Sequence, residues 1–168
     1  MLDVEIKLRD VEISNVYQQD LIGIKKWMEM KKTFAEEETN LDKLTERFLE
    51  SYISECEFFL KIKKSQELIG ILKGRLEFKS QNELWIWFFY LDKIYKDSDL
   101  GNVIIKKLMS YFSKEYDAAV FFTRIIKNEI QNLDFWKQMG FSVVRRVKNF
   151  YNINNKYVDM IIMRKVGD

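Results

Sequence analysis

The sequence predicts an α/β protein of the α+β kind, with a mixed, mostly antiparallel sheet of about seven strands flanked by about four helices. The first observation is composition: 47% of the residues are hydrophobic and 15% aromatic, which is ample for a buried core. The second is that the spacing of apolar residues changes along the chain, giving the order β-α-α-β-β-β-α-β-α-β-β. The length of 168 residues fits a single domain, residues 1–168.

The first half of the chain is predicted to hold a strand, two helices and three successive antiparallel strands. Apolar and charged residues mix in 5–13, which predicts the first strand. Apolar residues at helical spacing then predict two helices, the first with Asp20 as a candidate N-cap. The helices cover 20–30 (stripe Leu21, Ile24, Trp27, Met28) and 41–53 (stripe Leu41, Leu44, Phe48, Leu49, Tyr52), and the three strands cover 57–63, 68–78 and 83–91.

The strand at 83–91 is expected to be central, because both of its faces are apolar. Trp85 and Trp87 share one face, with Ile86 and Phe88 on the other. Core packing is the favoured role for the two tryptophans, and a wall for an acceptor pocket is the alternative.

The second half is predicted to return to helix and strand in turn. A helix over 100–115 has Leu100, Val103, Ile104, Leu108, Tyr111 and Phe112 as its buried stripe. A strand at 118–125 and a helix at 132–139, stopped by Gly140, come next, and "NINN" joins a final hairpin. A right-handed crossover through 100–115 makes strands 83–91 and 118–125 parallel. Mixed sheets often bind ligands where such parallel neighbours diverge.

The composition excludes several kinds of site. The chain has no histidine, which removes Ser-His-Asp and Cys-His catalysis and histidine-ligated metals, so we expect no metal site. The single cysteine, Cys56, cannot form an internal disulfide and is expected to be inert. A net charge of +2 gives no reason to expect nucleic acid as a partner. The charged N-terminus and the short apolar runs predict a cytoplasmic protein without signal peptide or membrane span.

The stretch "YKDSDLGNVIIKKL" (95–108) follows the most apolar run, "LWIWFFYL" (84–91). A strand, a tight loop and a helix start in this order are a common phosphate site, because a helix N-terminus offers N–H donors and a positive dipole end. This loop has one glycine, Gly101, and two carboxylates, Asp97 and Asp99. On structural grounds alone, Ser98 and Asp99 are good N-caps.

In this context, "FYLDKIYKDSDLGNVIIKKLM" and "NLDFWKQMGF" resemble the GNAT superfamily of acetyl-CoA-dependent N-acyltransferases. The resemblance covers the whole chain in element order and residues 83–141 in motifs. Leu91 and Tyr95 take the family's apolar and aromatic positions, and Lys96 stands for its Arg/Gln. Asp99 and Gly101 stand for its two glycines, while Trp136, Gly140 and Phe141 match the second segment. With Asp99 in place of a glycine, the loop is a degenerate version of the family's pyrophosphate loop.

The resemblance implies acetyl-CoA as co-substrate. It places the pyrophosphate on the start of the helix and the thioester at the end of the central strand. The expected cofactor-binding residues are Leu91, Lys96, Asp97, Ser98, Asp99, Leu100, Gly101, Asn102, Asn132 and Trp136. The family's frequent tyrosine, proposed to protonate the leaving thiolate, is replaced by Trp136, whose indole has no such proton to give.

The resemblance also implies an amine acceptor, either a small molecule or a protein N-terminus or lysine. Glu83 is the candidate general base, acting through water, and Glu77 is a comparable candidate. The segment "FAEEET" (34–39) is either an acidic mouth for a cationic amine or a solvated loop, and the loop is favoured.

Two alternatives assign the protein to other functional classes. In the first, the chain keeps the fold but its CoA site has decayed, and it is a non-catalytic binding or regulatory protein. "RRVK" (145–148) suggests an RNA-binding stripe, but Arg145 and Arg146 point to opposite faces of a strand, which disfavours it. The sequence leaves the acceptor open, and the oligomeric state as monomer or homodimer.

Overall fold

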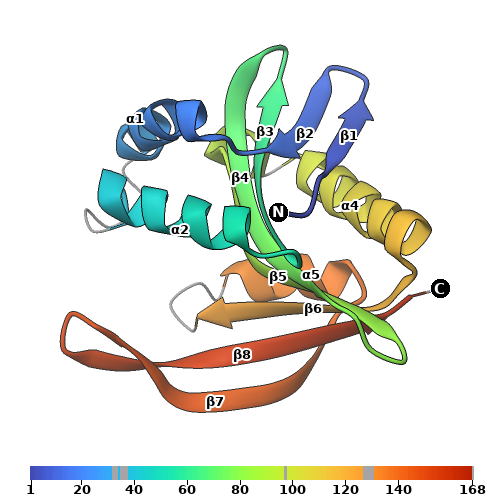
Figure 1. The fold of residues 1–168 in the computed structure, drawn as a ribbon. Coiled ribbons are helices and arrows are strands. Elements are labelled where there is room, and N and C mark those ends of the chain that lie inside the picture. The colour runs from blue at the N-terminus through green and yellow to red at the C-terminus, as the bar shows by residue number, and fades with distance from the viewer. Residues whose placement is uncertain (32–33, 35–37, 97, 127–130, 168) are drawn as a thin grey trace. The chain divides into compact units, whose positions relative to one another are not determined.

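The computed structural model describes residues 1–31, 34, 38–96, 98–126 and 131–167 (Figure 1). Its strands are β1 Glu5–Leu8, β2 Val11–Asn15, β3 Glu57–Lys64, β4 Glu67–Glu77, β5 Asn82–Leu91, β6 Ala118–Ile126, β7 Ser142–Ile153 and β8 Lys156–Val166. Its helices are α1 Leu21–Lys31, α2 Leu41–Ile53, α3 Lys93–Lys96, α4 Leu100–Tyr116 and α5 Gln131–Gln138, with a 3₁₀ turn η1 at Gln18–Asp20. The eight-stranded sheet has the order β1-β2-β3-β4-β5-β6-β8-β7, with β5 and β6 parallel. The predicted fold class is confirmed.

The chain divides into two compact units, which are described separately. Unit 1 comprises residues 1–74 and 89–98, and unit 2 comprises residues 75–88 and 99–168. The prediction of a single domain over 1–168 stays a prediction. None of the helices in the described part of the chain is long and apolar enough to cross a membrane.

In unit 1, the predicted strand 5–13 is in fact a hairpin of β1 and β2, which is a correction to the strand count. Leu8 pairs with Val11 across a turn at Arg9–Asp10, and Arg9 has a φ of 50°. Glycine or asparagine normally marks such a turn, so an arginine in the left-handed region left no signal in the sequence.

The two long helices of unit 1 begin and end close to their predicted limits, and they lie side by side in Figure 1. The stripe predicted for α1 is buried as expected. On α2, Leu44 and Phe48 are buried, but the predicted Leu41, Leu49 and Tyr52 are exposed. Asp20 does not cap α1: its carboxylate accepts hydrogen bonds from the backbone N–H of Tyr17 (2.8 Å) and from Lys61 Nζ (2.7 Å).

In unit 2, α4 buries Gly101, Ile104, Ile105, Leu108, Met109 and Phe112. The predicted Val103 is exposed, and Leu100 and Tyr111 are half-buried, so the buried face is rotated from the predicted one. Gly140 follows α5 with a φ of 90°, a conformation that favours glycine, as expected for a helix stop. Asn154 and Asn155, both at positive φ, make the predicted turn between β7 and β8.

Candidate functional site

The parallel pairing of β5 with β6 is shorter than either strand. It runs from Asn82–Ala118 to Ile86–Thr123, while β5 continues to Leu91 and β6 to Ile126. The predicted parallel pair is therefore confirmed, and its ladder stops before both strands end. This is the kind of position at which mixed sheets bind ligands.

The end of β5 is fastened to β4 within unit 1. The backbone N–H of Asp92 donates to the carbonyl of Ile69 at 2.6 Å. A Cβ atom added to Gly70 would lie 2.6 Å from the carbonyl oxygen of Tyr90, closer than real Cβ contacts come. Glycine at position 70 therefore allows the close approach that sets the path of the last residues of β5.

Residues from α1 and the segment after it also contact the end of β5. The ring of Phe34 meets the ring of Tyr90 edge-on, with 4.9 Å between centroids. Lys31 Nζ, at the end of α1, forms an ion pair with the Asp92 carboxylate, whose side chain is only 11% exposed. Both neighbours of Leu91 are thus held by side chains of unit 1. Sequence reasoning missed these contacts, because nothing in the sequence links Lys31 to a residue 61 positions away.

The turn between β5 and α4 is closed on Tyr95, whose backbone N–H donates to the carbonyl of Asp92 (2.8 Å). The Tyr95 carbonyl accepts from the backbone N–H of Ser98 (3.2 Å) and from its hydroxyl (2.7 Å). Ser98 therefore secures the turn and does not occupy the N-cap position, which corrects the prediction. Asp97 and the side chain of Lys96 lie outside the described part of the chain.

Asp99 is the N-cap residue of α4, as predicted, but by its backbone alone. Its carbonyl accepts from the N–H of Val103 (3.0 Å), while its side chain makes no capping hydrogen bond and is exposed. Its backbone has φ −67° and ψ −2°, an ordinary helical conformation. The aspartate at this position therefore needs no unusual backbone geometry, and its charge and its Cβ are what distinguish it from glycine. Next to it, Gly101 is buried and Leu100 and Asn102 are half-buried.

Trp136 lies in the core of unit 2. It is buried, with the rings of Phe135 and Phe141 edge-on to it at 5.2 and 5.0 Å between centroids. These packing contacts alone are a structural reason for the aromatic residues and the Gly-Phe pair of this segment. Asn132 belongs to α5, and its side chain lies outside the described part.

Glu83, the candidate base, is already engaged by two donors. Its Oε2 accepts from Lys79 Nζ (2.8 Å) and from Trp85 Nε1 (3.2 Å), and its side chain is 19% exposed. Glu77 contacts the same ammonium at 2.9 Å. The hydrogen bonds that Lys79 donates to Glu83 and then to Glu77 raise the pKa of Lys79, so the ammonium stays charged at neutral pH.

Glu83 also stands far from Leu91 along the strand. It is the second residue of β5 and Leu91 is the last. A strand rises about 3.3 Å per residue, so these eight steps cover roughly 26 Å, well beyond the reach of a single bridging water.

The tryptophan face of β5 is less buried than predicted. Leu84 and Ile86 are fully buried, whereas Trp85 and Trp87 are half-buried. Trp85 stacks on Phe122 of β6 at 4.3 Å between centroids, and the guanidinium of Arg124 lies 5.1 Å from the Trp87 ring. These side chains form a half-exposed aromatic surface on unit 2.

Other residues that the sequence singled out show no feature of a reactive centre. Cys56 is half-buried, and its backbone N–H donates to Ser54 Oγ (3.2 Å). Of the acidic segment 34–39, residues 35–37 lie outside the described part. Among the described residues, no group of three or more Asp, Glu and Cys side chains is placed to hold a metal ion.

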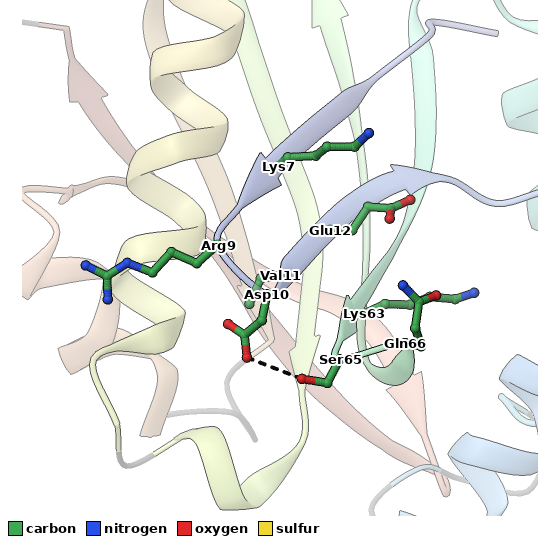
Figure 2. A pocket seen from close by; sticks show the side chains of 8 residues that line it. All are labelled: Lys7, Arg9, Asp10, Val11, Glu12, Lys63, Ser65 and Gln66. Carbon is green, nitrogen blue, oxygen red and sulfur yellow. Dashed lines mark hydrogen bonds between the residues drawn. The ribbon is translucent and has the colours of Figure 1, made fainter.

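A hollow of about 180 Å³ lies at the two hairpin turns of unit 1 (Figure 2). It is lined by Lys7, Arg9, Asp10, Val11, Glu12, Lys63, Ser65 and Gln66. Two of its charged side chains are paired locally: Lys7 pairs with Glu5 at 3.0 Å, and Asp10 pairs with Lys64 and accepts from Ser65 Oγ at 3.4 Å. Small-molecule sites usually measure about 300–1,000 Å³, so this hollow does not suit a nucleotide cofactor.

Comparison with known proteins agrees with the geometry. Residues 13–162 match the acetyltransferase (GNAT) domain, and the chain therefore belongs to the GNAT acetyltransferase family. Members of this family use acetyl-CoA. No curated protein sequence matches the chain.

Several solved acetyltransferases share the fold at 13% identity. The enzyme from Salmonella typhimurium that modifies the N-terminal serine of ribosomal protein L7/L12 superposes with a TM-score of 0.80, covering 96% of this chain and 97% of that one. The ribosomal-protein-S5-alanine acetyltransferase of Vibrio fischeri gives 0.79, covering 99% and 98%. The spermidine N-acetyltransferase of Vibrio cholerae, solved with CoA and spermine, gives 0.76, covering 95% and 96%. At this identity the likeness establishes the fold.

Proposed function

We propose that this GNAT acetyltransferase moves an acetyl or similar acyl group directly from acyl-CoA to a primary amine. The observation that carries the proposal is the end of the β5–β6 ladder at Ile86–Thr123, followed along the chain by the start of α4. A strand end released from its parallel neighbour and a helix N-terminus are the two parts that an acyl-CoA site of this family needs.

The donors present fit the cofactor. The start of a helix favours an anion because of its backbone N–H groups and the positive end of its dipole, and the Asp99 side chain makes no capping hydrogen bond there. Bound acetyl-CoA would have its pyrophosphate on residues 96–102 and its thioester beside Leu91. Asn132 and Trp136 stay predicted cofactor contacts, although the burial of Trp136 supports a packing role first. The loop is a degenerate form of the family pattern, with Asp99 in place of a glycine.

The reaction balances without a metal or a histidine. The neutral amine attacks the thioester carbonyl carbon, so a C–N bond forms, the C–S bond breaks and CoA leaves as its thiolate. The amine proton passes to water, and the thiolate leaves unprotonated or takes a proton from water. The sequence suggests Glu83 as the first acceptor of that proton through water, but the length of β5 between it and Leu91 disfavours this role, so we expect water alone to take the proton.

The acceptor is either a protein N-terminus, or lysine, or a small amine. Structural relatives include an acetyltransferase of a ribosomal protein's N-terminal serine and an acetyltransferase of spermidine, and both kinds of substrate present a primary amine. A cytoplasmic location, a monomer or homodimer, and the absence of nucleic acid from the partners stay predictions.

The direct test is release of free CoA thiol when acetyl-CoA is mixed with a panel of amines. The panel holds spermidine, a lysine side-chain peptide, and peptides beginning with serine or alanine. We expect release that depends on one class of amine, with acetylated product seen by mass spectrometry. If acetyl-CoA binds but none of these amines is acetylated, the acceptor lies outside the panel. If acetyl-CoA does not bind at all, the proposal is refuted.

The second candidate is a non-catalytic protein that keeps the fold. The carboxylate of Asp99, which is exposed and makes no capping hydrogen bond, favours this alternative, because its charge opposes a bound phosphate. Under this alternative, neither CoA nor acetyl-CoA raises the midpoint of thermal unfolding, whereas a functional site raises it by mass action.

A further inference from the structure

Leu91, at the proposed thioester position, is bracketed by contacts on both of its chain neighbours, and all of them lie within unit 1. From β4, Gly70 lies close to the carbonyl of Tyr90, and the carbonyl of Ile69 accepts from the backbone N–H of Asp92. In addition, the ring of Phe34 contacts the ring of Tyr90, and the Lys31 ammonium pairs with the Asp92 carboxylate. The residues before and after Leu91 are therefore each held twice.

The ion pair differs from the surface pairs of the same unit in its burial. The side chains of Lys31 and Asp92 are 26% and 11% exposed, against 33% and 47% for Lys25 and Glu29 on the same helix. A partly buried carboxylate that loses its partner keeps an uncompensated charge, which costs far more than losing an exposed pair.

That uncompensated charge would stand next to the proposed cofactor. Asp92 follows Leu91 directly, and acetyl-CoA brings several negative phosphate charges to the same turn. Lys31 thus cancels a carboxylate that would otherwise repel the co-substrate.

We propose that Lys31 is a positioning residue for acyl-CoA, acting through Asp92: it neutralises this carboxylate, which would otherwise repel the co-substrate at the end of β5. The proposal rests on the proposed function, because it needs acyl-CoA at Leu91. It adds a dependence of cofactor binding on the last residue of α1.

The experiment compares Lys31→Met, Asp92→Asn and the double variant with the natural protein, by acetyl-CoA titration calorimetry and steady-state kinetics. The matched control is Lys25→Met, which removes a lysine from the same helix and an exposed pair. Lys31→Met is expected to raise the Kd and KM for acetyl-CoA by roughly tenfold, with kcat within about threefold.

Restoration in the double variant is the decisive result. With Asp92→Asn added, no unpaired charge remains, so Kd and KM return to within about threefold of the natural values. Rising salt shrinks the Lys31→Met defect, because the repulsion is electrostatic. Lys25→Met leaves both constants unchanged.

A purely structural pair gives a different result. Lys31→Met would then lower the unfolding midpoint of the free protein, while the acetyl-CoA constants, measured well below that midpoint, stayed at natural values. That outcome overturns the inference but leaves the proposed function standing. If the natural protein itself binds no acetyl-CoA, it is the proposed function that fails.

Discussion

Asp99 shows how one side chain can oppose a ligand without distorting the backbone. Under the proposed assignment, Asp99 stands where the family has its first glycine, and its φ of −67° is one that any residue adopts without strain. What remains is a carboxylate that makes no capping hydrogen bond at the start of α4. At about 5 Å and an effective dielectric constant near 20, it opposes one phosphate charge by roughly 3 kcal/mol before salt screening.

Two substitutions at this residue separate charge from shape. We expect Asp99→Asn and Asp99→Gly to tighten acetyl-CoA binding by similar factors, roughly tenfold at physiological salt, because only the charge is unfavourable. Calorimetric titration of both variants measures this. Tightening by glycine alone would show that the Cβ atom, and not the charge, limits the approach of the phosphate.

Two glycines of unit 1 should respond in opposite ways to alanine. At Gly70 the new Cβ would lie 2.6 Å from the Tyr90 carbonyl oxygen, so we expect a loss of about 1–3 kcal/mol in the free energy of unfolding. At Gly23, inside α1, nothing lies within 4 Å of the new Cβ, so we expect a gain of about 0.5–1 kcal/mol. Urea denaturation of Gly70→Ala and Gly23→Ala gives both values. Equal shifts in the same direction would contradict the close approach of β4 to Tyr90.

The role of Glu83 as a general base can be tested by substitution, and its ion pair with Lys79 bears on the expected result. Because the folded-state pKa of Lys79 is raised above 10.5, the pair's contribution to stability is fully present below that pH and is lost as pH rises through the folded pKa. The Lys79 ammonium, the partner of Glu83, therefore stays charged at neutral pH. With roughly 26 Å of strand to Leu91, we expect Glu83→Gln to change kcat by less than about threefold.

The measurement is the pH profile of kcat for Glu83→Gln beside that of the natural enzyme. If the variant unfolds at the normal midpoint but its kcat on the low-pH limb of the profile is lower by about a hundredfold or more, Glu83 is the base. The path of the acceptor amine would then have to run along β5 away from Leu91.

At the scale of elements, periodic patterns could be read from the sequence and non-local ones could not. The stripe of α1 and the stop of α5 at Gly140 depend on residues within a few positions of one another, and both were predicted. The β1–β2 turn at Arg9 was missed because its residue type is unusual for a positive φ.

The candidate site likewise has parts that the sequence predicts and parts that it does not. The strand, the turn and the helix start were visible as "LWIWFFYL" followed by "YKDSDLG". The contacts on the two neighbours of Leu91 were not visible, because the partner of Asp92 is Lys31, 61 residues earlier, and no local pattern indicates this pair. The cap geometry of Ser98 and Asp99 was also beyond the sequence, because either residue type can cap and only the backbone path decides.

The strand β7 should resist pairing with another chain. It is the last strand in the sheet order, and it is almost wholly exposed, with Arg145, Arg146 and Lys148 along it. Its register with β8 shifts between Val143 and Arg145 and again between Val147 and Tyr151. Charges and bulges of this kind protect edge strands against edge-to-edge association.

Replacing the three basic residues by threonine tests this protection. We expect the variant Arg145→Thr, Arg146→Thr, Lys148→Thr to self-associate at concentrations where the natural protein does not, as measured by light scattering. Unchanged scattering up to about ten times that concentration would show that the bulges alone suffice.

For the whole molecule, membership of the GNAT acetyltransferase family rests on the match over residues 13–162, and the fold agrees with it. The particular claim for this chain is that a loop with one glycine and an exposed aspartate still holds acyl-CoA.

Calorimetric titration of the natural protein with acetyl-CoA tests that claim most directly. The account predicts one site per chain with a Kd on the order of 10 µM, weaker at high salt because phosphate contacts are screened. No heat of binding and no thermal shift at about 1 mM acetyl-CoA would contradict it, and would leave a GNAT-fold protein whose cofactor loop no longer binds.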